Sequence, residues 1–165
     1  MKNIYTTEEW AALKERIRER KQEGQKLVFT NGCFDILHPG HTALLAFARK
    51  QGGVCVLGLN TDLSVKKLKG PDRPVNIESI RAQNLLRTGY VDVIVFYNED
   101  TPQKITDVLE PDILIKGDDY SIETIVGAPE VTARGGKVLV FKKIPGYSTT
   151  AILDNETKNN ETNRG

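Results

Sequence analysis

Thr30-Asn31-Gly32-Cys33-Phe34-Asp35-Ile36-Leu37-His38-Pro39-Gly40-His41 is the stretch from which the fold of this 165-residue chain can be predicted. It follows an apolar run at 27–29, typical of a strand buried in a parallel sheet, and it precedes a helical pattern over residues 42–50. The stretch is therefore predicted to be a strand-to-helix turn, which is where open α/β sheets bind their ligands. The chain has two histidines, His38 and His41, and both lie in this turn.

The rest of the chain repeats the same alternation of apolar runs and helical patterns. Strands are predicted at about residues 26–30, 54–59, 91–96, 112–115 and 137–141, with helical segments between them. This order predicts an α/β fold, a Rossmann-like open parallel sheet of about five strands with helices on both faces. We expect an N-terminal surface helix within residues 1–24, one folded domain over 25–153 and a disordered polar tail over 154–165.

Two of the helices carry residue-level predictions. The N-terminal helix should place Trp10, Leu13 and Ile17 on one face. A later helix is expected to be capped by the side chain of Asn76. Its inner side is predicted to consist of Ile77, Ile80, Asn84, Leu85 and Leu86.

Composition narrows the class of protein. The chain is 39% apolar and 27% charged, as in folded globular domains, and its net charge of +1 creates no strong attraction to nucleic acid or membrane. No apolar segment is long enough to cross a bilayer, and the N-terminus lacks the apolar core of a signal peptide. Cys33 and Cys55 have no metal-ligand spacing. We therefore expect a cytoplasmic protein with neither nucleic acid nor membrane as a partner.

The histidine turn has the chemistry of an anion site. Two imidazoles spaced three apart at a helix N-terminus can point to the same side, where backbone N–H groups and the helix dipole favour negative charge. Gly40 would let a phosphate approach the backbone closely. Two rival interpretations remain at this point: turn histidines hydrogen-bonded to local backbone, and a metal site, for which a third ligand at suitable spacing is missing.

The same residues resemble a family signature. A strand, a glycine, Phe34-Asp35 and then His-x-Gly-His resemble the nucleotidyltransferase superfamily that includes cytidylyltransferases and pantetheine-phosphate adenylyltransferase. Residues 68–75, 99–102, 116–120 and 147–150 are further similar to bacterial heptose 1-phosphate adenylyltransferases, so that the likeness covers about 26–153. The resemblance implies that the domain transfers AMP from ATP to a heptose 1-phosphate, with Mg²⁺ accompanying ATP, to make ADP-heptose for lipopolysaccharide. A separate sugar kinase would supply the acceptor, and a homodimer is expected.

The resemblance also assigns roles at matching positions. His38 and His41 would hold the nucleotide phosphates and stabilise the transition state, with Lys69 as a mobile catalytic cation. The implied nucleotide-binding residues are Thr30, Asn31, Gly32, Phe34, His38, Gly40, His41, Lys116, Gly117, Ser148, Thr149 and Thr150. The implied substrate-binding residues are Asp35, Asp62, Arg73 and Asp119. The resemblance assigns no metal ligand from the protein.

Several positions leave alternatives open. Lys69 could be a solvated charge like its neighbours, and Arg73 and Arg81 could bind phosphate or pair with a carboxylate. Asp118 stands where the relatives usually have glycine, and the basic residue that many relatives carry after residues 148–150 is missing. Two other functions also remain: a cytidylyltransferase for glycerol 3-phosphate or an amino-alcohol phosphate, and a non-catalytic nucleotide-binding regulatory module.

Overall fold

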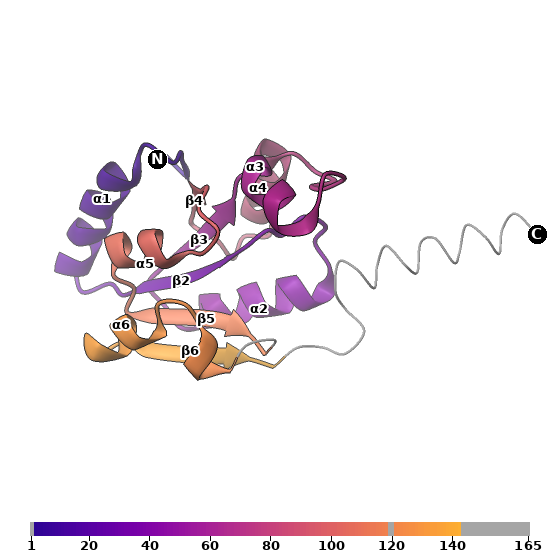
Figure 1. Ribbon diagram of the computed structural model, residues 1–165. Helices are drawn as coiled ribbons and strands as arrows, with labels where there is room; N and C mark the ends of the chain where they lie inside the picture. The colour runs from indigo at the N-terminus through magenta and orange to yellow at the C-terminus, as the bar shows by residue number, and fades with distance from the viewer. Residues whose placement is uncertain (1, 119–120, 143–165) are drawn as a thin grey trace, which may run out of the picture.

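The computed structural model describes residues 2–118 and 121–142, and within them it forms a six-stranded sheet in the order β1-β4-β3-β2-β5-β6 (Figure 1). Every neighbouring pair of strands is parallel. The strands are β1 (Ile4–Tyr5), β2 (Leu27–Gly32), β3 (Val54–Asn60), β4 (Val93–Tyr97), β5 (Ile113–Gly117) and β6 (Lys137–Phe141). The helices are α1 (Trp10–Gln22), α2 (Pro39–Lys50), α3 (Asp62–Lys69), α4 (Glu78–Arg87), α5 (Gln103–Leu109) and α6 (Ala128–Ala133), with a 3₁₀ turn η1 (Ile122–Thr124).

Alternate residues of the strands build a separate core on each face of the sheet. In β4, Val93 and Val95 belong to the core that includes residues of α1, α5 and α6, whereas Ile94 and Phe96 belong to the core that includes residues of α2 and α4. This period of two is the pattern of a pleated strand buried on both sides. The Rossmann-like α/β prediction with helices on both faces is confirmed, and Figure 1 shows α1 beside α5 on one of these faces.

The N-terminal segment forms the predicted surface helix and also a short strand that was not predicted. Leu13 and Ile17 are buried, as expected, and the Trp10 indole donates to the Phe96 carbonyl at 2.9 Å. The preceding residues add the two-residue edge strand β1, which the sequence did not predict because two residues carry no readable alternation. The proposed division at residues 24 and 153 stays a prediction, and the tail lies outside the described residues. No helix in the described part of the chain is long and apolar enough to cross a bilayer.

The prediction for the inner side of α4 is partly wrong. Ile77 and Ile80 are 54% and 48% exposed, and Leu85 is buried together with Ala82 and Arg81. Asn84 is half-buried and Leu86 packs against the edge of the core. The apolar pattern misled because an arginine with four hydrogen-bond acceptors occupies the centre of the inward face.

The cap of α4 and the start of α2 also differ from expectation. Residue 77, not Asn76, is the N-cap of α4, and the Asn76 side chain donates instead to the Asp35 carbonyl at 2.8 Å. Helix α2 begins at Pro39 rather than at residue 42. His38 is therefore the N-cap and His41 lies in the first helical turn, which brings both rings to the end of the helix.

Candidate active site

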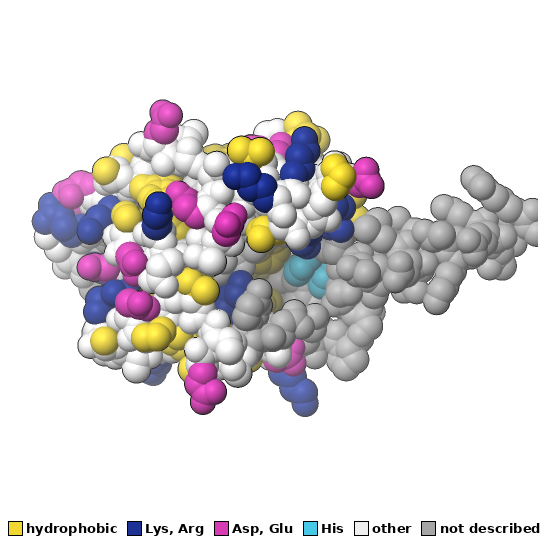
Figure 2. All heavy atoms as spheres, in the orientation of Figure 1, with side chains coloured by type: hydrophobic (Ala, Val, Ile, Leu, Met, Phe, Trp, Pro, Cys, Tyr) yellow, Lys and Arg dark blue, Asp and Glu magenta, His cyan; other side chains and the backbone are white. Residues whose placement is uncertain are grey.

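The histidine turn leaves β2 at the point where the direction of chain progression reverses. From β2 the chain proceeds to β3 on one side, whereas β5 and β6 lie on the other side. Such a switch point creates a crevice at the carboxyl ends of the strands, where open α/β sheets bind ligands. Figure 2 shows histidine side-chain atoms at the surface, close to lysine and arginine side chains.

The two imidazoles are stacked at the N-terminus of α2. Their ring centroids are 3.6 Å apart with an interplanar angle of 23°. His38 Nδ1 accepts a hydrogen bond from the backbone N–H of His41 at 3.3 Å, so the neutral His38 ring carries its proton on Nε2. An Nε2–H group can donate to a phosphate oxygen. The bond between His38 and the backbone of His41 is the local backbone contact that the interpretation as turn histidines expects, and the stacked pair also lies at a helix end that favours anions. The anion site stays a prediction.

The ring of Phe34, in the same turn, lies near the histidine pair. Its ring centroid lies 5.0 Å from that of His41, and its backbone has a φ of 45°, which a non-glycine residue rarely adopts. A Cβ at Gly32 would lie 2.9 Å from the Phe34 ring, so a side chain at position 32 would displace the ring. Strained backbone of this kind clusters at functional sites.

Asp35 is a buried anchor for the loop that follows α3. Its carboxylate accepts from Arg73 Nε at 2.9 Å and from the backbone N–H groups of Val75 and Asn76 at 2.8 and 2.9 Å. Burial by itself would raise the pKa of Asp35, but the hydrogen bonds from Asn76, Val75 and Arg73 outweigh burial and lower it. The charged carboxylate therefore ties the histidine turn to residues 73–76.

Arg81 joins the same turn to β3 and α3. Its side chain is fully buried, and it donates to the carbonyls of Asn76, Cys33 and Asn60 at 2.8–2.9 Å. Its remaining guanidinium nitrogen pairs with Asp62 at 2.8 Å. Of the two roles open to Arg81 from sequence, the structure shows the pairing with a carboxylate. Arg73 is likewise paired, with Asp35.

A chain of buried polar side chains crosses the carboxyl ends of β2, β3 and β4. Asn31 Nδ2 donates to the Tyr97 hydroxyl at 3.0 Å, Tyr97 donates to Asn60 Oδ1 at 2.9 Å, and Asn60 Nδ2 donates to Ser64 at 2.9 Å. Sequence reasoning missed Tyr97, Asn60 and Ser64 as part of the site. The available signal was that polar groups end three apolar strands in succession, at residues 31, 60 and 97.

Positive side chains surround the turn. Lys116 Nζ donates to the Asn31 carbonyl at 3.0 Å, and Lys69 is the exposed last residue of α3. Burial raises the pKa of the Cys33 thiol, and the nearby charges of Lys69, Arg81 and Lys116 oppose part of that rise. The thiol therefore stays protonated near neutral pH and is no candidate nucleophile. Lys69, Arg81 and Lys116 are therefore near enough to Cys33, within the histidine turn, to act on it electrostatically.

The remaining predicted site residues differ in their location and burial. Thr30 is buried in β2, Gly40 is buried in the first turn of α2, and Gly117 ends β5. Asp118 is exposed beyond β5. The other predicted residues, Asp119, Ser148, Thr149 and Thr150, lie outside the described part of the chain. No group of three or more His, Cys, Asp and Glu side chains within residues 2–118 and 121–142 is arranged to hold a metal ion.

Comparisons with known proteins show what the chain is similar to. A family model described as cytidylyltransferase-like matches residues 29–155. A relative named bifunctional protein HldE, from Marinomonas sp. (strain MWYL1), is 49% identical over 142 residues, which cover 86% of this chain and 30% of the relative. The chain thus spans about 30% of the length of that relative.

Two solved structures have a similar fold. The lipopolysaccharide core biosynthesis protein from Thermoplasma volcanium GSS1 has a TM-score of 0.58 and 26% identity, covering 73% of this chain and 98% of that one. A pantoate-beta-alanine ligase from Francisella tularensis has a TM-score of 0.58 and 14% identity, covering 88% of this chain and 69% of that one. The second likeness concerns the fold alone.

Proposed function

The chain belongs to the cytidylyltransferase-like family, and from this membership we propose that it transfers AMP from ATP to a heptose 1-phosphate. The products are ADP-heptose and pyrophosphate. The observation that carries the proposal is the stacked pair His38 and His41 at the N-terminus of α2. Two similarities support heptose 1-phosphate as the acceptor: the sequence identity with a bifunctional HldE protein, and the structural similarity to a lipopolysaccharide core biosynthesis protein.

The reaction is one in-line displacement at the α-phosphorus of ATP. An oxygen of the acceptor phosphate forms the new bond, the bond to the oxygen that bridges to the β-phosphorus breaks, and pyrophosphate leaves with that electron pair. The acceptor is already an anion, so no enzyme nucleophile and no general base are required. Catalysis then consists of positioning and of stabilising charge on the phosphates.

The histidine pair supplies that stabilisation. His38 is fixed by its hydrogen bond to the backbone of His41, and the stacked rings with the first N–H groups of α2 form a rigid set of donors. Donors that are already oriented lower the barrier because they need not reorganise as charge develops. Thr30, Asn31, Gly32 and Phe34 shape this pocket, and Gly40 admits the phosphates to the backbone.

Two lysines are proposed to complete the nucleotide site. Lys116 is placed beside Asn31 at the carboxyl end of β5, and the exposed Lys69 can swing onto the β- and γ-phosphates. Mg²⁺ bound to ATP neutralises phosphate charge and would be held mainly by phosphate oxygens and water. Gly117, Ser148, Thr149 and Thr150 remain proposed nucleotide contacts.

We propose that Asp62, Arg73 and Asp119 bind the acceptor, although Asp119 lies outside the described residues. Arg73 Nε is occupied by Asp35, whereas its Nη2 is buried and has no hydrogen-bond partner among the described residues. A phosphate oxygen would satisfy that donor. Asp35 then acts on the acceptor through Arg73, because its own side chain has no exposed surface.

Three wider proposals accompany this function. A separate sugar kinase makes the heptose 1-phosphate, the chain works in the cytoplasm, and it forms a homodimer. The two cysteines are free, which supports a reducing compartment. Five large apolar side chains are about half exposed between α3 and α4, which supports contact with a second copy: Leu63, Leu68, Val75, Ile77 and Ile80.

A substrate panel tests the function. Pyrophosphate release is measured with ATP or CTP against heptose 1-phosphate or glycerol 3-phosphate, in all four combinations. We expect rapid release with ATP and heptose 1-phosphate and much slower release with the other three. Release confined to CTP and glycerol 3-phosphate would replace the proposal by the cytidylyltransferase alternative. Binding of ATP with no release from any pair would indicate a non-catalytic nucleotide-binding module.

A further inference from the structure

A pocket of about 720 Å³ opens at the amino ends of the strands, opposite the histidine turn. It lies where α1 and α2 end and where β2, β3 and β4 begin. Its apolar wall includes Leu13 and Ile17 of α1 and Val54 of β3. Strand β3 has seven residues, so about 20 Å separates this pocket from the active-site end of the same strand. Ligands could occupy both places at once.

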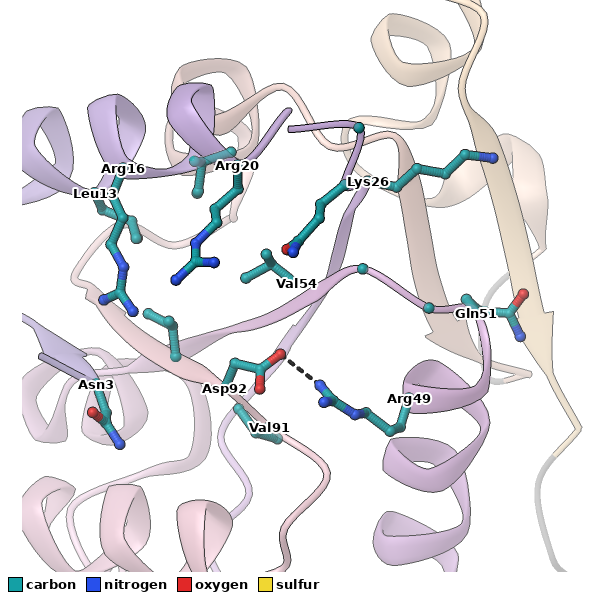
Figure 3. Close-up of a pocket in the computed structure, with 16 residues that line it drawn as sticks. Asn3, Leu13, Arg16, Arg20, Lys26, Arg49, Gln51, Val54, Val91 and Asp92 are labelled. Atoms are coloured by element: carbon teal, nitrogen blue, oxygen red, sulfur yellow. Dashed lines mark hydrogen bonds and ion pairs between the residues drawn. The ribbon is translucent and has the colours of Figure 1, made fainter. Parts of the chain in front are cut away.

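The charges that line the pocket are mostly positive. Arg16, Arg20, Lys26 and Arg49 line it, and Asp92 is the one acidic residue among the lining residues, an excess of three positive charges. The whole chain, by contrast, carries a net charge of +1. Figure 3 shows the Arg16 and Arg20 guanidinium groups on one side, the Arg49–Asp92 pair on the other and Val54 between them.

A simpler explanation accounts for part of this charge. Arg20 and Arg49 lie in the last turns of α1 and α2, where basic residues commonly complement the negative end of the helix dipole. Each dipole is equivalent to only about half a negative charge. Two helix ends therefore offset about one of the three excess positive charges, and Glu23, which pairs with Arg20 at 3.7 Å, offsets part of another. A positive excess remains, which favours an anionic ligand such as a phosphate monoester, with a charge of about −1.5 to −2 near neutral pH.

We propose that this pocket is a second ligand site, for a small organic phosphate. The volume lies within the range of small-molecule sites, and an apolar wall combined with a few convergent charged groups is their usual composition. Arg20 is the main phosphate contact, because its guanidinium faces the space beside Val54 and its side chain is one-third exposed. Its ion pair with Glu23, at 3.7 Å, is longer than a hydrogen bond, and a phosphate oxygen would compete with it. The Arg49–Asp92 pair holds the opposite side, since Asp92 also accepts from the backbone N–H of Cys55 at 2.8 Å.

Glycine amides distinguish the two sites in a nuclear magnetic resonance titration. Gly24, Gly52 and Gly53 line the new pocket, whereas Gly32 and Gly40 belong to the histidine turn. The full ¹⁵N-labelled chain is titrated with ribose 5-phosphate, and with D-ribose as the uncharged control at the same ionic strength. We expect saturable shifts of the amides at the pocket with ribose 5-phosphate and none with D-ribose.

Two variants of α1 identify the contact. Arg20→Ala should raise the dissociation constant read from the pocket amides by about tenfold or more, because one charge-assisted hydrogen bond is lost. Arg18→Ala is the matched control, because Arg18 is exposed on the same helix and pairs with Glu15 outside the pocket. Shifts confined to Gly32 and Gly40, equal shifts with D-ribose, or equal affinities of the two variants would each overturn the proposal.

Discussion

At the scale of single residues, the turn works because each side chain fixes the next. His38 is oriented by the backbone of His41, the His41 ring rests near Phe34, and Phe34 depends on the bare backbone of Gly32. At His41 the N-cap bond uses the backbone N–H and not the ring, so the ring can be removed while the cap of α2 remains. Chemistry and stability can therefore be separated by substitution.

Replacing His41 by alanine should lower kcat by about 10²–10³-fold, the usual loss for one transition-state hydrogen-bond donor. The thermal midpoint should change little, because α2 keeps its N-cap and its buried Leu45. Steady-state pyrophosphate release and circular dichroism measure the two effects. Thr42→Ala, one residue further along the same helix, is the control and should retain activity. A kcat of His41→Ala near that of the wild type would remove the histidine turn from the mechanism.

Arg81 should behave in the opposite way, as a residue on which folding depends. Arg81→Met leaves Asp62 and three carbonyls without their donor, and we expect a loss of about 3–5 kcal/mol in the free energy of unfolding. Urea denaturation measures it. Arg87→Met, exposed at the end of the same helix, should change stability by less than about 0.5 kcal/mol. If Arg81→Met does not fold, Arg81→Lys should fold with reduced stability; equal stability of both Arg81 variants and the wild type would refute the role.

Asp35 should make stability depend on pH in acid. Its pKa in the folded chain lies below its usual value near 3.8, so the carboxylate contributes fully above that value and its contribution is lost as the pH falls through the lowered pKa. The stability difference between wild type and Asp35→Asn should be constant from pH 7 to about pH 5 and shrink below about pH 4. Urea midpoints at several pH values measure it, with Asp72→Asn, exposed in the loop that Asp35 anchors, as control. Parallel wild-type and Asp35→Asn curves down to pH 3 would contradict this role.

At the scale of elements, the connection between α2 and β3 is held by a close backbone approach. A Cβ at Gly53 would lie 2.1 Å from the Lys26 carbonyl oxygen, and the residue has a φ of 77°. That carbonyl also accepts the first hydrogen bond of β3, from Val54 at 2.8 Å. The start of the strand therefore depends on the absence of a side chain at residue 53.

Gly53→Ala should lower the free energy of unfolding by about 3 kcal/mol, from backbone strain and overpacking together. Gly52→Ala is the matched control. Its φ of 83° is similar, but nothing lies within 4 Å of its Cβ, so only the strain of about 1–2 kcal/mol should remain. Thermal or urea unfolding compares the two. Equal losses in both variants would show that the contact with Lys26 is relieved at little cost.

The elements also show what could be predicted from the sequence. The strands and the histidine turn were predictable because apolar runs and the turn residues are local signals. The inward face of α4 was not, because burying Arg81 requires acceptors on Cys33, Asn60 and Asp62, far away in the chain. The link between Asn31 and Tyr97 spans 66 residues and is equally invisible to a local pattern. Polar groups that satisfy one another across strands are known only once the strands are placed.

At the scale of the whole molecule, two regions with basic side chains lie at opposite ends of the strands of the sheet. The histidines and lysines lie at the carboxyl ends of the strands, and the arginine-lined pocket lies at the amino ends. The sequence pointed to the first, because its residues are neighbours in the chain. It could not point to the second, whose lining comes from five separate segments between residues 3 and 93.

Transfer of AMP to heptose 1-phosphate by this chain is the central claim, and phosphorus magnetic resonance tests it most directly. The chain is incubated with ATP, Mg²⁺ and heptose 1-phosphate, alongside its His41→Ala variant. The wild type should convert the ATP signals into those of pyrophosphate and of a nucleoside diphosphate sugar, in equal amounts. The variant should do so at least about 10²-fold more slowly. Unchanged ATP with the wild type, or equal rates for the two proteins, would contradict the claim.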